Sequence, residues 1–148
     1  MAGNSIRELI LLAVLAAVRP AAQALGAGVH RSPTVAITRE QSPALVVFPE
    51  SEAITERAND RVTRELTLRI VALARAVPPA VPETEADRLM TAAHAALMAD
   101  TNLGGLALGI REQECEWEVD DADAVAAAIP TRYQVTYRTL ASDLSTLG

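Results

Sequence analysis

The stretch Arg61–Arg75 (RVTRELTLRIVALAR) limits the choice of fold most strongly, because it is long and contains neither glycine nor proline. Read as a strand, it alternates between two faces. One face carries Val62, Leu66, Leu68, Ile70 and Ala72, and the other carries Thr63, Glu65, Thr67 and Arg69. Read as a helix, it would place Leu68 opposite the other apolar residues, and its threonines suit a pleated surface better. The stretch therefore predicts a long strand.

Apolar patterning and turn residues divide the rest of the chain into further elements. They predict helices over residues 5–18 and 84–100, and strands over 34–38, 44–48, 106–119 and 131–140. Loops are expected at 21–31, 50–60 and 120–129, the last with a short helical turn, and a mobile polar tail at 141–148. All eight prolines fall between these elements, as the missing N–H and fixed φ of proline require.

These elements predict an α+β fold for residues 1–148 as a single domain. We expect a mainly antiparallel sheet of four to five strands with two main helices packed on it, in the order α-β-β-β-α-β-β. A chain of 148 residues is long enough to bury a core without a metal or a disulfide, and its single cysteine, Cys115, excludes an internal disulfide.

The N-terminal segment has two possible interpretations. An apolar run over residues 9–18 is followed by Ala22-Gln23-Ala24, which resembles a cleavage site, so an exported small binding domain is one alternative. Against it, Arg7 is followed at once by Glu8, and Ser5 with Glu8 forms a capping box that favours a retained helix. The run is too short to span a bilayer, so we expect no membrane association.

Apolar side chains cover most of the circumference of the predicted first helix. We expect this surface to serve either the core of one subunit or a contact with a second subunit, and the pattern leaves both open. The candidate contact residues on this helix are Ile6, Leu9, Ile10, Leu11, Val14 and Leu15.

The charge of the chain is unevenly distributed. A net charge of -6, a pI near 4.9 and the lack of any Lys/Arg cluster argue against a nonspecific nucleic-acid binder. The most acidic segment contains Glu112, Glu114, Glu116, Glu118, Asp120, Asp121 and Asp123. It lacks the spacing of an EF-hand, so we interpret it as a solvated strand face, with Cys115 and Trp117 packed inward on the other face.

No catalytic motif is visible. The two histidines, His30 and His94, belong to no nucleophile–base pattern, and Gly26-Ala27-Gly28 lacks the lysine and the preceding strand of a phosphate-binding loop. We therefore predict no enzyme activity, no cofactor and no metal site.

Three short motifs, in the order of elements given above, resemble the tail terminator family of long-tailed bacteriophages. They are EQSPALVVF at 40–48, RELTLRIV at 64–71 and YQVTY at 133–137. This family is also called tail-completion or head–tail joining proteins and includes the lambda-type minor tail protein. The resemblance covers residues 5–138.

The resemblance implies a structural virion protein at the head–tail junction, assembled in the bacterial cytoplasm. It implies a ring, typically a homohexamer, that caps the tail tube, ends its polymerisation and meets a head-completion or connector protein. DNA would pass through without specific binding, and the acidic segment could line that lumen. In such a ring Thr63, Glu65, Thr67 and Arg69 could meet a neighbouring subunit. Another tube-assembly protein, such as a tail tube subunit or a contractile-system completion protein, is the alternative.

Overall fold

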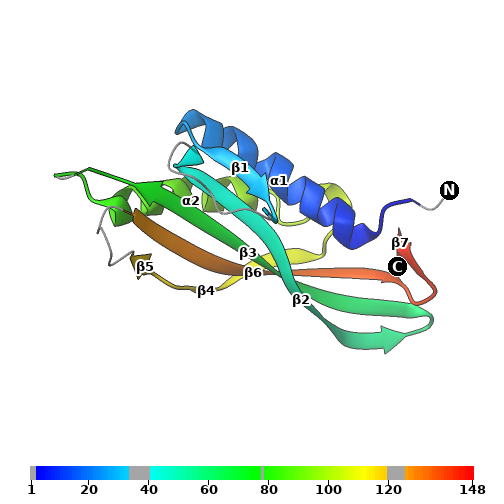
Figure 1. The fold of residues 1–148 in the computed structure, drawn as a ribbon. Helices are drawn as coiled ribbons and strands as arrows, with labels where there is room; N and C mark the ends of the chain where they lie inside the picture. Colours follow the sequence, from blue (N-terminus) through cyan, green and yellow to red (C-terminus); the bar gives the residue numbers. More distant parts are fainter. Residues whose placement is uncertain (1–2, 34–40, 78, 120–125) are drawn as a thin grey trace.

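A computed structural model describes residues 3–33, 41–77, 79–119 and 126–148 (Figure 1). The elements are α1 (Ile6–Ala24), β1 (Gly28–Arg31), β2 (Ala44–Ala58), β3 (Arg61–Arg75), α2 (Pro82–Met98), a 3-10 turn η2 (Leu103–Gly105), β4 (Gly109–Cys115), β5 (Glu118–Val119), β6 (Ala126–Leu140) and β7 (Asp143–Leu147). The strands form one sheet in the order β1-β2-β3-β6-β4, and β5 and β7 also pair with β6. Among the described strands, β1 and β2 pair in parallel and the other pairs are antiparallel.

Both helices lie on the same face of the sheet (Figure 1). The predicted α+β class and the order of the main elements are confirmed. Within the described residues the sheet has seven strands rather than four to five. The predicted strand at 106–119 is divided into β4 and β5, and the short strands β1 and β7 were not expected. The predicted strand at 34–38 lies outside the described residues.

Strand β3 confirms the alternation from which the fold was predicted. Its predicted apolar face is buried beneath the helices. On one side β6 pairs with its whole length, and on the other β2 pairs with it from Arg61 to Leu73. Opposite these side chains, Tyr133, Val135 and Tyr137 of β6 fill the same core, with the two tyrosines at most 1% exposed. The one exception is Arg64, a charged residue on the core face that is only 9% exposed.

The predicted loop at 50–60 was wrong, because β2 continues to Ala58 and forms a long hairpin with β3. The turn residues Asn59 and Asp60 have φ angles of 50° and 64°, which is the conformation of a type I′ hairpin turn. Residues in this part of β2 are mostly exposed, so the apolar alternation that would reveal a strand is absent.

The rule that every proline falls between elements was also wrong. Pro20 lies inside α1, on its exposed side, where water can bind the carbonyl of Ala16 that loses its amide partner. Pro49 lies in β2 at a register shift, beyond the last residue that β1 pairs. Pro130 lies in β6 between the residues that pair with β4 and those that pair with β5. Edges and interruptions of this kind tolerate a missing N–H.

Three predicted loops or tails contain strands. Residues 28–31, predicted as loop, form β1, and residues 126–129 begin β6. The predicted mobile tail forms β7, which pairs with the end of β6. These segments are short or dominated by small and polar residues, so periodicity could not identify them. The rest of the predicted 120–129 loop lies outside the described residues.

The helix ends follow the sequence signals only in part. The Ser5 hydroxyl accepts the Glu8 N–H at 3.2 Å, as in a capping box, but the Glu8 carboxylate binds Arg31 instead of completing it. Helix α1 runs on to Ala24, beyond the predicted end at residue 18. Helix α2 begins at Pro82, because proline suits the first turn of a helix, so the predicted capping box at Thr84 does not form.

Candidate functional site

Five of the six candidate contact residues on α1 are buried in the core of their own chain. Ile6, Ile10, Leu11, Val14 and Leu15 are at most 5% exposed, and Leu9 is partly buried against the same core. Leu12, which was not selected, is 43% exposed. These five side chains belong to the core of their own chain, as one of the two expectations had it. A contact with a second subunit stays a prediction for Leu9.

The acidic segment does not present one continuous acidic face. A register shift between Glu112 and Glu114 changes the alternation of β4, so Glu112 lies near His94 of α2 while Glu114 lies near Arg132 on the opposite side of the sheet. Glu118 belongs to β5, and Asp120, Asp121 and Asp123 lie outside the described residues. The assignment of these acids to a lumen stays a prediction.

The predicted inward packing of Cys115 and Trp117 was wrong. Cys115 is exposed, and Trp117 is 56% exposed in the break between β4 and β5. Cys115 pairs with Thr131, which belongs to the buried row of β6, so it lies on the helix side of the sheet. It is exposed because β4 is an edge strand whose side chains are exposed from Arg111 onward.

The face of the sheet opposite the helices carries a ladder of paired polar side chains. Thr63 accepts a hydrogen bond from Arg138 at 3.1 Å, and Glu65 accepts one from Gln134 at 2.6 Å. The Arg69 guanidinium lies 5.6 Å from the centre of the Phe48 ring. Thr63, Glu65, Thr67 and Arg69 thus do share one face, as the alternation predicts.

Arg132 joins three strands of this polar face. It donates to Glu50 of β2 at 2.7 Å and to Glu114 of β4 at 2.6 Å, and it lies 3.6 Å from Glu116. Hydrogen bonding to Arg132 lowers the pKa of Glu50. The two carboxylates in turn raise the pKa of Arg132. The face therefore carries compensated charges, which lets a neutral or polar surface approach it closely.

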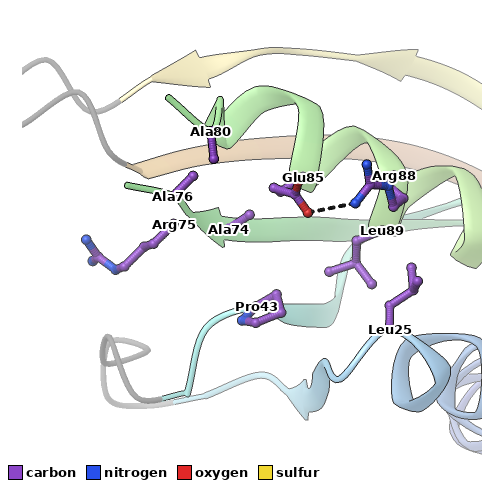
Figure 2. Close-up of a pocket in the computed structure, with 9 residues that line it drawn as sticks. All are labelled: Leu25, Pro43, Ala74, Arg75, Ala76, Ala80, Glu85, Arg88 and Leu89. Carbon is purple, nitrogen blue, oxygen red and sulfur yellow. Dashed lines mark hydrogen bonds and ion pairs between the residues drawn. The ribbon is translucent and has the colours of Figure 1, made fainter. Parts of the chain in front are cut away.

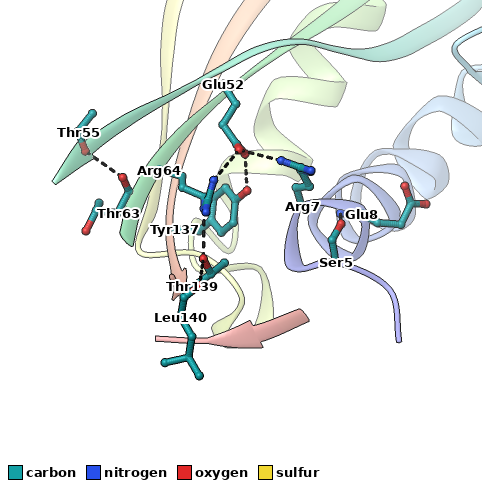
Figure 3. A network of polar contacts seen from close by, with 10 residues as sticks. All are labelled: Ser5, Arg7, Glu8, Glu52, Thr55, Thr63, Arg64, Tyr137, Thr139 and Leu140. Carbon is teal, nitrogen blue, oxygen red and sulfur yellow. Dashed lines mark hydrogen bonds and ion pairs between the residues drawn. The ribbon is translucent and has the colours of Figure 1, made fainter. Parts of the chain in front are cut away.

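A second polar cluster anchors the hairpin to α1 (Figure 3). Glu52 accepts hydrogen bonds from Arg7 at 3.0 Å, from Arg64 at 3.3 Å and from the Tyr137 hydroxyl. Arg64 also donates to Thr139 at 3.1 Å. Burial, followed by the hydrogen bond to Glu52, raises the pKa of Tyr137. Sequence reasoning missed this cluster, although the position of Arg64 on an apolar face was a usable signal.

The histidines take structural positions. His30 is half-buried in β1. His94 shares a hydrogen bond of 2.8 Å with the Tyr133 hydroxyl and lies 3.3 Å from Glu112. Burial is the main cause of the raised pKa of Tyr133. Within the described residues, no group of three or more His, Cys, Asp or Glu side chains is arranged to hold a metal ion. In that same part of the chain, neither helix combines the length and apolarity needed to cross a membrane.

A cavity of about 280 Å³ opens between the end of α1, the start of β2, the end of β3 and the start of α2 (Figure 2). Its wall is largely apolar and includes Leu25, Pro43 and Leu89, and the Glu85–Arg88 ion pair of 3.0 Å lies beside it. Arg75 is exposed and extends outward at its edge (Figure 2). Sequence reasoning missed this cavity, because its residues come from four separate segments.

The fold has a counterpart among solved structures. No protein-family model and no curated protein matches the sequence. The described chain is similar in fold to a chain in the structure titled "Virion of native gene transfer agent (GTA) particle", with a TM-score of 0.59 and 13% sequence identity. The similarity covers 85% of this chain and 92% of that one. The chain therefore shares its fold with a component of that virion particle.

Proposed function

We propose that this chain is a structural protein of a phage-like virion and that it acts as a tail terminator. In this role it forms a ring, typically of six subunits, on the end of the tail tube. The ring stops tube polymerisation and presents a surface to the head-completion or connector protein. The role requires no catalysis and no cofactor.

The observation that carries the proposal is the fold similarity to a virion chain over nearly the full length of both chains. It agrees with the tail terminator resemblance of the motifs at 40–48, 64–71 and 133–137. Residues 44–48 of the first motif stand on β2, and the other two motifs stand on β3 and β6. The three strands are adjacent in the sheet, so the motifs form one continuous part of the fold.

The surface chemistry suits a subunit of a closed assembly. Every subunit of a ring needs two different contact surfaces, and this sheet offers two chemically distinct edges. The net charge of -6 would keep DNA from adhering to the wall of a channel, since like charges repel.

Particle mass in solution tests the proposal. Mass photometry over a concentration series, followed by negative-stain imaging, should give closed rings of one size. In the second stage the purified rings are added to polymerising tail tube subunits, and tube length is measured. We expect tubes to stop growing and to carry one ring at an end.

Two results would overturn the proposal. Open stacks or tubes made by this chain alone would identify a tube subunit instead. A monomer that neither assembles at high concentration nor binds tube ends would exclude a terminator role.

A further inference from the structure

Trp117 is an unusual surface residue. It is the only tryptophan of the chain and is 56% exposed in the break between β4 and β5. Glu116 and Glu118 flank it in the sequence, so it is a large apolar group within an acidic segment. Exposed tryptophans of this kind are typical anchors of protein–protein contacts, because one side chain buries a large area with little loss of conformational freedom.

The cavity between α1 and α2 has complementary chemistry. Its volume of about 280 Å³ lies below the usual range for small-molecule sites and suits one large side chain. Leu25 and Pro43 give it an apolar wall. Arg75, at its edge, makes no ion pair with any residue that the structure describes, whereas Arg88 is already paired with Glu85. An apolar side chain would fill the cavity, and an acidic residue next to it in the sequence would pair with Arg75.

The two features lie at the same end of the sheet: Trp117 is at its β4 and β5 edge, and the cavity lies over β3 and the start of β2, away from that edge. Val71 of β3 is paired with Pro130 of β6, whose carbonyl accepts the Glu116 N–H, so Trp117 lies at this level on the β4 and β5 edge. Ala74, which lines the cavity, pairs with Ala127 only three residues further along β6. The cavity also borders Pro43, which directly precedes β2, so it extends toward the β1 and β2 strands and away from the β4 and β5 edge.

This placement fits subunits that stand side by side around an axis. Rotation about the axis keeps each feature at its own height, so the β4 and β5 edge of one subunit would face the β1 and β2 edge of the next. The contact would be heterologous, since different surfaces meet, which is what a closed ring requires.

From this we propose that Trp117 of one subunit inserts into the cavity lined by Leu25, Pro43 and Leu89 of a second copy of this chain, with Glu116 facing Arg75. The proposal rests on the proposed ring and names its subunit contact.

Intrinsic fluorescence tests the contact directly, because the chain has only one tryptophan. Emission and particle mass are measured together over a concentration series of the full chain. Indole emission moves to shorter wavelength on leaving water, so the shift should follow ring formation. Trp117→Ala should raise the dissociation constant between subunits by about 30-fold, the effect of a central anchor. Arg75→Glu, which keeps the fluorophore, should raise it by about tenfold and reduce the shift.

Leu108→Ala is the matched control. Leu108 is also 56% exposed and precedes β4, so its loss removes apolar surface from the same edge of the sheet. We expect this variant to assemble as the unmodified chain does. Circular dichroism checks that all three variants are folded.

The outcomes separate this contact from the ring itself. Rings that form while Trp117 keeps its solvent-exposed emission, or that form equally well in Trp117→Ala, overturn the contact and leave the terminator role standing. A shift seen only after tail tube subunits are added assigns Trp117 to that partner and overturns the self-contact. A chain that stays monomeric at every concentration, alone and with tube subunits, overturns both.

Discussion

At the scale of single residues, the buried charge of Arg64 on the core side of the sheet is paired with the carboxylate of Glu52. Glu52 has three donors around its carboxylate, and one of them, Arg64, is only 9% exposed. Removal of the Glu52 carboxylate would leave the buried Arg64 guanidinium unpaired and would cost the folded protein several kcal/mol of stability. Glu52 is therefore needed to hold the base of the hairpin. Sequence alone indicated Arg64 as a break in the apolar alternation, but it could not indicate a partner twelve residues away on another strand.

Thr131 offers a test of the opposite case, a buried polar group that lacks a partner. Its hydroxyl is buried in β6 without a hydrogen bond among the described residues. Thr131→Val keeps the β-branched shape and removes the unsatisfied group, so we expect a gain of about 1 kcal/mol and a rise in Tm of about 3 °C. Thermal unfolding followed by circular dichroism measures it.

The control for this test is Thr139→Val, since the Thr139 hydroxyl accepts from Arg64 at 3.1 Å. That variant should lose stability, because it removes a partner from a buried cation. A loss of stability in Thr131→Val would mean that its hydroxyl is hydrogen-bonded in solution.

At the scale of elements, the sequence predicted those that bury a regular apolar stripe and missed those that do not. Strand β3 and both helices were predicted because their apolar periodicity matches a helix or a strand. The C-terminal half of β2 and all of β7 are mostly exposed. They are strands because their backbones pair with β3 and β6, and this pairing leaves no apolar pattern in the sequence. For the candidate site, the alternation of β3 gave the correct polar face. Cys115 and Trp117 were mispredicted as packed inward, because the edge position of β4 and the break after it leave them exposed.

Pro20 misled the prediction of where α1 ends, and it provides a test of the helix. It lies on the exposed side of the helix, and the last turn of the helix has no basic residue. Pro20→Ala should stabilise the protein by about 2 kcal/mol, from about 3 gained in the helix less about 1 for the freer unfolded chain. Urea unfolding measures the change, with Arg19→Ala as the neighbouring exposed control. A less stable Pro20→Ala protein would show that the proline fits its position in α1 without strain.

At the scale of the whole molecule, ion pairs between elements set the response to acid. Arg31 of β1 lowers the pKa of Glu8 of α1, and Arg132 of β6 lowers that of Glu50 of β2, below the ordinary value of 4.5. Carboxylates with a lowered pKa in the folded state stabilise it above the unfolded pKa, and this contribution disappears as pH falls through the folded pKa. The pairs are partly exposed, so each contributes modestly.

We therefore expect Tm to change little as the pH falls from 7 to about 5 and to decline below about 4.5. Thermal scans at 50 mM and 500 mM salt measure this profile, because salt weakens exposed ion pairs. Glu50→Gln should have a shallower acid decline than the unmodified chain. An equally steep decline in that variant would exclude the Glu50–Arg132 pair as a contributor.

The pairing of β3 with β6 has a consequence for how the protein is made. The register joins Arg61 to Leu140 and Arg75 to Ala126, so the centre of the sheet pairs segments from the middle and the end of the chain. During synthesis β3 has no second neighbour until β6, about 50 residues further along the chain, has left the ribosome. Until then the apolar faces of α1, α2 and β3 lack their cover, and folding that depends on such distant pairing is slow. The nascent chain is thus most prone to aggregate between the synthesis of β3 and that of β6.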